Sequence, residues 1–266
     1  MADYVIIRRG RNILSTILHV LLNLILAIAT IFLNLATASF LPGCALVLLS
    51  KWRMFAVRPR YLFINIKSNL VDLIMGFSFV FLAYCAGNIL SPLHYVLTAL
   101  YSLWLIVLKP MSSNFATKLQ ALLAVFFGST AITLMVASSS SGLTVLLNFI
   151  LGFAVARHVL VQSEDTEYSL ITLISGLIFA EISWLAEFWL IVYSFKAFGL
   201  IIPQVSIILT ILAFLAGLLY QNASQNDQKI EKKDILVPTI FAISVILIIV
   251  LWFSKPCLLY TSDAAD

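Results

Sequence analysis

Charged residues are scarce in this chain. Only 11% of its 266 residues are Asp, Glu, Lys or Arg, whereas 62% are hydrophobic, and the mean hydropathy is +1.07. A soluble domain needs a surface that is about a quarter charged, so this composition excludes one. The net charge of +4 implies no nucleic-acid partner, because cationic loops beside membrane spans account for it.

The sequence also lacks the motifs of several protein classes. It has no G-x-x-x-x-G-K-[ST], H-E-x-x-H, G-x-S-x-G or TVGYG sequence, so ATP-driven transport, protease chemistry and a selective K+ channel have no support. Its three His residues are scattered and do not have the spacing of a metal site. We therefore expect no metal, no cofactor and no catalytic residue, although an enzyme is kept below as an alternative.

Long apolar runs fill most of the chain. They cover residues 13–35, 37–54, 69–87, 90–108, 119–137, 143–161, 168–192, 199–220 and 235–254. A helix needs about 20 apolar residues to cross roughly 30 Å of hydrocarbon. The predicted fold class is an all-α, polytopic transmembrane bundle of about nine helices with no soluble domain. The second run is the weakest, because Pro42 and Gly43 interrupt it and Lys51 ends it early.

The few cations lie beside every second gap between these runs, with Lys196 and Lys255 as the exceptions. Cationic loops stay on the cytoplasmic side of a membrane. We therefore predict a multi-pass protein of the plasma or inner membrane with a cytoplasmic N-terminus. Residues 8–11 and 51–60 are both strongly basic, and both are cytoplasmic only if the chain crosses twice between them. This favours nine crossings over eight.

Residues 1–256 are expected to form a single membrane-embedded domain, because no connection between the runs is long enough to fold by itself. The last ten residues, CLLYTSDAAD, resemble a translated sequencing-adapter read-through. We therefore expect residues 257–266 to be a non-native tail, with the natural sequence cut near Pro256.

The first run carries a polar stripe. Its members are Asn12, Thr16, His19, Asn23, Thr30, Asn34 and Thr37, and on a helix they fall within an arc of roughly 80°. Lipid cannot satisfy such a stripe, so it must face other helices or water. His19, Asn23, Thr30 and Asn34 are therefore candidates for the wall of a cavity. Interhelical hydrogen bonds, worth roughly 0.6 kcal/mol each, are the alternative that we favour.

The seventh run holds two carboxylates, Glu181 and Glu187. They are about 120° and roughly 9 Å apart on an unbroken helix, so they cannot share a proton. No Lys or Arg lies at the depth of Glu181, and desolvation favours a neutral carboxyl group there. We expect Glu181 to face protein, either as a structural hydrogen-bond donor or as a coupling residue. Glu187 is a second candidate for a cavity or coupling residue, but it lies near the outer interface with Lys196, and we favour that simpler explanation.

One face of the same run consists of small residues. Its members are Ser169, Thr172, Gly176, Ala180 and Ser183. Small side chains allow close approach of another helix, so this face predicts a helix-packing partner.

A basic and aromatic segment follows the second run. Its cations are Lys51, Arg53, Arg58, Arg60 and Lys67. This mixture suits the headgroup region of a bilayer, and anionic lipid headgroups are the expected partners. Topology and interfacial anchoring also explain the segment, and we prefer that interpretation. Asp72, close to Lys67, is expected to form an interfacial ion pair or to be hydrated.

Three function classes remain. The first is a secondary transporter or permease-like protein for a small solute or lipid, with Glu181 in its cavity. The second is a non-enzymatic membrane scaffold or assembly partner that uses the small-residue face. The third is a lipid-modifying membrane enzyme that works through the basic segment. A cavity reaching Glu181, an open small-residue face, or carboxylates beside residues 51–67 would distinguish them.

Overall fold

The computed structural model describes residues 13–87, 89–136, 140–161, 168–188, 191–195, 199–225 and 232–252. Helices make up almost all of these residues. They are α1 (Ile13–Thr37), α2 (Leu41–Ser50), α3 (Trp52–Phe55), α4 (Pro59–Ser68), α5 (Leu70–Cys85), α6 (Pro92–Leu103), the π-helix η1 (Trp104–Leu108), α7 (Asn114–Val136), α8 (Ser141–Leu160), α9 (Tyr168–Glu187), α10 (Gln204–Gln225) and α11 (Lys232–Trp252). The fold is therefore all-α apart from one small hairpin.

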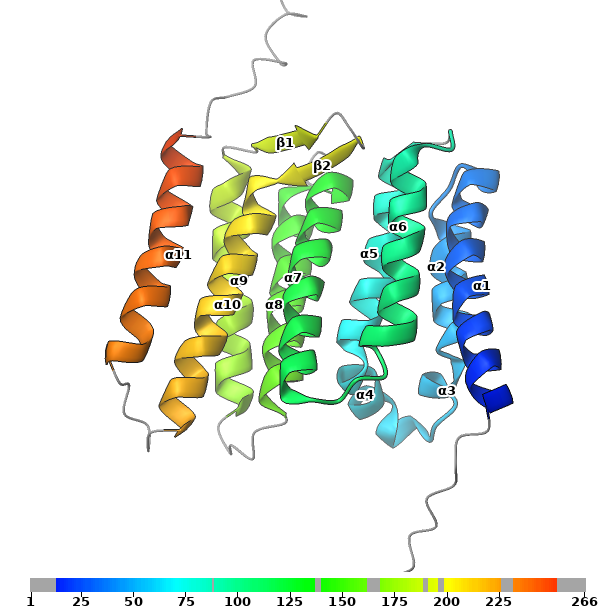
Figure 1. Cartoon of the computed structure of the whole chain (residues 1–266), viewed down its shortest axis with the longest axis horizontal. Coiled ribbons are helices and arrows are strands. Elements are labelled where there is room, and N and C mark those ends of the chain that lie inside the picture. Colours follow the sequence, from blue (N-terminus) through cyan, green and yellow to red (C-terminus); the bar gives the residue numbers. More distant parts are fainter. Residues whose placement is uncertain are drawn as a thin grey trace, which may run out of the picture.

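The long helices stand side by side, with α1 at one edge of the bundle and α11 at the other (Figure 1). Helices α7 and α8 lie in the middle. The two strands, β1 (Val192–Phe195) and β2 (Leu200–Pro203), pair antiparallel with Val192 opposite Pro203. They cover one end of the bundle, here called the hairpin end, whereas α3 and α4 lie at the opposite end.

That opposite end is here called the basic end, because the described Lys and Arg side chains all belong to its loops and helix termini. They are Lys51, Arg53, Arg58, Arg60, Lys67, Lys109, Lys118 and Arg157. The helices α7, α9 and α11 begin at this end, and α8 and α10 finish there (Figure 1). Lys196, the residues before Ile13 and the tail 257–266 lie outside the described residues.

Among the described residues, six helices are long and apolar enough to cross a membrane, and α4 and α5 together would make a seventh. The protein is thus a multi-span membrane protein, but the expected nine spans are not all found. The second and fourth runs form only shorter apolar helices, α2 and the pair of α6 and η1. Helix α2 has 10 residues, so it is about 15 Å long, which is half of a hydrocarbon core.

The second run is shortened from its beginning. A tight turn at Ala38, with a φ of 49°, follows α1, and Pro42 lies in the first turn of α2. Proline is well suited to that position because its missing N–H would have no helical partner there. Pro42 therefore starts a short helix instead of interrupting a long one.

The seventh run is also shorter than predicted. Helix α9 ends at Glu187, five residues before the end of the predicted run, and the last residue of that run, Val192, begins strand β1. Apolar character alone does not distinguish a buried helix from a short strand, so the sequence pattern extended the helix too far.

The core lies between α5, α6, α7 and α8. The Phe79 ring stacks on Tyr101 and contacts Phe127, with 5.0 Å between ring centroids in both pairs. Both Phe79 and Tyr101 are only 1% exposed. Helix α11 differs, because most of its large apolar side chains are exposed in the single chain. Such side chains are suited to lipid contact.

Candidate functional site

A buried ion cluster joins three segments at the basic end. Asp72 lies in the first turn of α5. It forms ion pairs with Lys51, between α2 and α3, and with Lys109, after η1. The Lys109 Nζ lies 2.9 Å from Asp72 Oδ2, and Trp104 Nε1 donates to Asp72 Oδ1 at 3.3 Å. A carboxylate in the first turn also interacts favourably with the helix dipole.

Two lysine side chains share the single carboxylate of Asp72. The Lys51 side chain is 9% exposed and that of Lys109 is 40% exposed. Lys51 lies outside the candidate spans, and its burial, together with the Lys109 charge, lowers its pKa to about 6. Lys67, the cation expected beside Asp72, belongs to no ion pair among the described residues.

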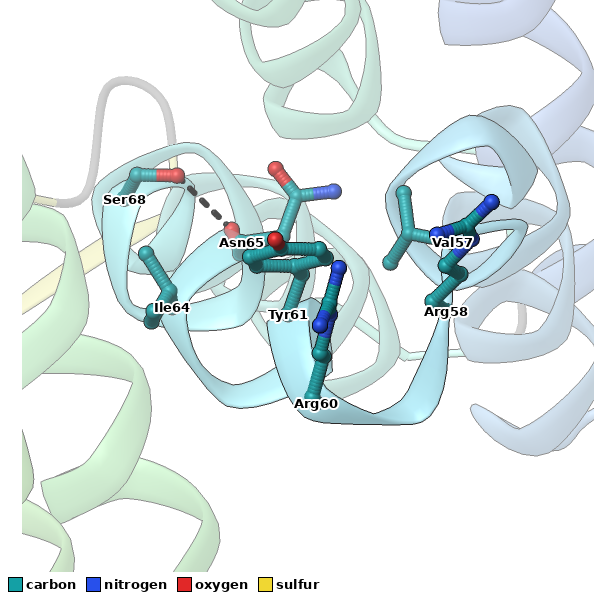
Figure 2. Close-up of a pocket in the computed structure, with 7 residues that line it drawn as sticks. All are labelled: Val57, Arg58, Arg60, Tyr61, Ile64, Asn65 and Ser68. Atoms are coloured by element: carbon teal, nitrogen blue, oxygen red, sulfur yellow. Dashed lines mark hydrogen bonds between the residues drawn. The ribbon is translucent and has the colours of Figure 1, made fainter.

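A basic concavity of about 500 Å³ opens beside this cluster's helices, on α4 and the turn before it. Its lining is Val57, Arg58, Arg60, Tyr61, Ile64, Asn65 and Ser68 (Figure 2). The Arg60 guanidinium lies 4.6 Å from the centroid of the Tyr61 ring. A cation–π contact of this kind holds the guanidinium in place without neutralising it.

The backbone supports the concavity. Pro59 starts α4, and Asn65 Nδ2 donates to the Met54 carbonyl at 3.0 Å, which ties α4 to α3. Helix α4 meets α5 at 65° after a break at Asn69. It therefore crosses the direction of the spans, as an interfacial helix does.

The predicted headgroup residues thus divide into three groups. Lys51 is drawn into the Asp72 cluster. Arg58 and Arg60 line the concavity. Arg53 and Lys67 are exposed on the same segment but do not line it.

The polar stripe of α1 divides as well. Thr30 and Asn34 are buried, at 0% and 3% exposed, whereas His19 is exposed and Asn23 is half-buried. Asn34 Nδ2 donates to the Val80 carbonyl of α5 at 2.8 Å. A Cβ atom on Gly43 of α2 would lie 2.3 Å from Asn34 Oδ1. Asn34 therefore fastens α1 to α2 and α5, in agreement with the packing interpretation.

The contacts of Asn23 and Thr30 stay within α1. Asn23 Nδ2 lies 3.2 Å from the His19 ring nitrogens and donates to the His19 carbonyl at 3.0 Å. Thr30 donates to the Leu26 carbonyl at 2.7 Å. Local bonds of this type satisfy a polar group inside its own helix.

Helix α9 keeps its two carboxylates apart, because it is continuous from Tyr168 to Glu187. Glu181 is exposed in the single chain and does not line the concavity. This differs from the expectation that it faces other helices of the bundle. Glu187 is half-buried near the hairpin end, and its Oε1 is enclosed without a hydrogen-bond partner among the described residues.

The small-residue face of α9 packs on α8 of the same chain. A Cβ atom on Gly152 would lie 2.6 Å from Phe179 Cγ, and one on Gly176 would lie 2.9 Å from the Phe149 carbonyl oxygen. Thr172 and Ser183 are buried in this contact, whereas Ala180 is half-buried and Ser169 is exposed. The helix that this face was expected to receive is therefore α8.

Sequence reasoning missed the polar contacts of Gln120 and the role of Lys109. Gln120 Oε1 lies 2.9 Å from His158 Nε2, which joins α7 to α8, while its Nε2 donates to the Met111 carbonyl at 3.1 Å. His94 is 1% exposed and its Nε2 lies 3.2 Å from the Ala83 carbonyl oxygen. The only signal for these contacts was that each residue lies at the end of an apolar run.

No group of three or more His, Cys, Asp or Glu residues could hold a metal ion within the described part of the chain. No family model matches the chain, and no significant match was found among curated proteins or solved structures. The site chemistry is therefore the only basis for a functional proposal.

Proposed function

We propose that this membrane protein binds the phosphate of an anionic lipid headgroup at its basic end. The observation that carries the proposal is that Arg58 and Arg60 line one open concavity on α4. Guanidinium groups form bidentate hydrogen bonds with phosphate oxygens. Neither arginine takes part in an ion pair among the described residues, so both can bind an external anion.

The surface around the concavity suits the edge of a bilayer. Tyr61, Phe63 and Ile64 of α4 are 47%, 72% and 61% exposed. Exposed aromatic and aliphatic side chains beside arginines are typical of interfacial helices, which insert their apolar side among the lipids. A lipid could therefore place its phosphate at the arginines and its acyl chains against this apolar surface.

The geometry gives less support to the three alternatives. A transporter with Glu181 as its coupling residue needs a cavity at that residue, but the concavity lies on α4. A scaffold that uses the small-residue face has to compete with α8 for it. A lipid-modifying enzyme needs a free carboxylate beside the basic segment, and Asp72 is held by Lys51 and Lys109. Lipid binding without transport or catalysis is the proposal that remains.

The proposal is tested by measuring the affinity of the purified protein in neutral detergent for a short-chain phosphatidic acid. The double variant Arg58→Gln/Arg60→Gln should weaken binding about ten- to thirtyfold, since each cation contributes about 1 kcal/mol near an anionic surface. Phosphatidylcholine should bind weakly to both proteins. Millimolar inorganic phosphate should compete poorly, because it lacks the acyl chains.

The matched control is Arg53→Gln/Lys67→Gln, which removes two exposed cations from the same segment without changing the lining of the concavity. It should weaken binding by no more than about threefold. Equal loss in the two double variants would mean diffuse surface charge and would overturn the proposed site.

Orientation is a separate part of the proposal. The basic end is expected to face the cytoplasm, since cationic loops remain there during insertion. Reporter fusions after Lys67 and Lys118 should then report a cytoplasmic location, and a fusion after Ser140 should report an external one. An external signal after Lys67 would contradict the orientation and the crossing by α1 and α2.

A further inference from the structure

The concavity on α4 is larger than a single phosphate group requires. Its volume of about 500 Å³ lies within the range of roughly 300–1,000 Å³ that is typical of small-molecule sites. Besides the two arginines, its lining includes the polar side chains of Tyr61, Asn65 and Ser68 (Figure 2). The ligand therefore has room for a substituent on its phosphate, and polar groups are present to contact that substituent.

Two of these polar side chains have unused hydrogen-bonding atoms. Asn65 Nδ2 donates to the Met54 carbonyl at 3.0 Å, which leaves Asn65 Oδ1 as an acceptor without a partner among the described residues. The Tyr61 hydroxyl, on a side chain that is 47% exposed, has no hydrogen bond among them either. Ser68 differs, because its hydroxyl donates to the Asn65 carbonyl at 2.8 Å. A ligand can therefore donate to Asn65 and exchange a hydrogen bond with Tyr61.

The charges of the lining limit what the substituent can carry. The described residues that line the concavity include two arginines and no carboxylate. An ammonium group would be repelled by the arginines and would have no acidic partner there, so choline, ethanolamine and serine headgroups are poorly suited. An unsubstituted phosphate would leave Tyr61 and Asn65 without a contact. Hydroxyl groups are neutral and both donate and accept hydrogen bonds, so they match these two side chains.

We infer that the concavity holds a polyol headgroup, that is, a glycerol or inositol group esterified to the phosphate of a lipid. The phosphate binds to Arg58 and Arg60. The hydroxyl groups of the polyol bind to Tyr61 and Asn65, which line the same concavity. This inference rests on the proposed lipid binding and names the class of headgroup that is bound.

The test compares two short-chain lipids, phosphatidylglycerol and phosphatidylpropanol, with the same acyl chains. Each carries one phosphodiester charge, and they differ only in the two hydroxyl groups of the glycerol headgroup. Affinities are measured for the purified full chain in neutral detergent. Phosphatidylglycerol should bind about three- to tenfold more tightly, which corresponds to one or two additional hydrogen bonds. Equal affinities that both fall in Arg58→Gln/Arg60→Gln would overturn the polyol assignment and leave the phosphate site in place.

The variant Tyr61→Phe tests the position of the hydroxyl groups. It removes one hydroxyl from the lining and keeps the aromatic ring against the Arg60 guanidinium. The preference for phosphatidylglycerol should fall about two- to fivefold, whereas the affinity for phosphatidylpropanol should stay within about twofold of wild type. The matched control is Tyr95→Phe on α6, where the side chain is 64% exposed and does not line the concavity. It should keep the full preference. An unchanged preference in Tyr61→Phe would overturn the inferred placement.

Two further outcomes separate this inference from the proposed function. If wild type and Arg58→Gln/Arg60→Gln bind both lipids equally, the phosphate is not bound at the arginines and both proposals fail. Millimolar glycerol 3-phosphate should compete poorly, because it lacks acyl chains that pack against the apolar surface of α4. Complete displacement of phosphatidylglycerol by micromolar glycerol 3-phosphate would identify a soluble polyol phosphate as the ligand and would overturn the assignment to a lipid.

Discussion

Asp72 and Glu181 are both carboxyl side chains in apolar helices, but the chain surrounds them differently. Asp72 lies at the basic end, where two lysines and Trp104 contact it. Glu181 lies on the outer face of α9 with apolar neighbours and no described partner. The cost of removing a charge from water is offset by an ion pair in the first case. In the second, no ion pair or hydrogen bond within the described residues offsets it.

The comparison indicates which polar groups stabilise the single chain. Variants of Asp72 should therefore alter its stability. Variants of Glu181 should leave its folding nearly unchanged.

The largest effect is expected for Asp72→Asn, which removes the carboxylate that Lys51 and Lys109 both contact. Breaking a buried pair costs about 3–5 kcal/mol, and the partial exposure of Lys109 should reduce this to about 2–4 kcal/mol. Thermal unfolding of the purified protein in detergent measures the loss. Lys109→Met leaves the Lys51 pair in place and should cost less than about 1 kcal/mol. Equal losses in the two variants would contradict the cluster.

Gly152→Ala tests the contact between α8 and the inner face of α9. The new Cβ would meet Phe179 at 2.6 Å and the Ser175 carbonyl oxygen at 2.9 Å, so α8 and α9 must move apart. Overpacking of this kind costs about 1–3 kcal/mol. The control is Gly217→Ala in α10, where a Cβ meets nothing within 4 Å, and it should be neutral or stabilise the helix by up to about 1 kcal/mol. Chemical unfolding in mixed micelles distinguishes the two.

Asn34→Ala should cost about 1–2 kcal/mol, because it removes the hydrogen bond from α1 to the Val80 carbonyl and leaves a void beside Gly43. Asn23→Ala, on the same helix, removes only local bonds to His19 and should stay within about 0.5 kcal/mol. Unfolding midpoints of the two variants give the comparison. A larger loss from Asn23→Ala would favour a functional contact on the exposed part of the stripe.

The last prediction concerns pH. Burial and the Lys109 charge lower the pKa of Lys51 in the folded chain to about 6, from an ordinary value of 10.5. Between these values the unfolded chain binds more protons, so this residue makes the free energy of unfolding increase with pH. Lys51→Met should flatten that increase, whereas the exposed control Lys67→Met should not. Unfolding curves between pH 6 and about 10 measure the slopes. An unchanged slope in Lys51→Met would mean that protonation of Lys51 does not cause the pH dependence of the free energy of unfolding.

Much of the architecture could be predicted from the pattern of apolar runs, because a long apolar stretch in lipid must satisfy its backbone as a helix. This identified α1, α7, α8, α10 and α11. The errors came where tertiary context competes with local pattern. The turn at Ala38 shortened α2, and strand β2 replaced the first residues of the predicted eighth span.

The candidate site was predictable only in part. Basic and aromatic residues after the second run indicated a headgroup surface, and two of its five cations line the concavity. The separation of Lys51 from Arg58 and Arg60 was not predictable, because it depends on Asp72 and Lys109, which lie 21 and 58 residues further along the chain than Lys51. Pairings of that sequence distance require the packed helices that bring them together.

The sequence by itself determined that this is a helical protein of the membrane, since 62% hydrophobic residues arranged in long runs have no stable alternative in water. It also determined that cations collect at alternate connections. Only the tertiary structure decided which face of each helix is covered. Side chains project from all sides of a helix, and the packing of the helices determines which of them contact another helix, a charged partner or lipid. In the folded chain Asp72 therefore contacts two lysines, whereas Glu181 lies exposed on the outer face of α9.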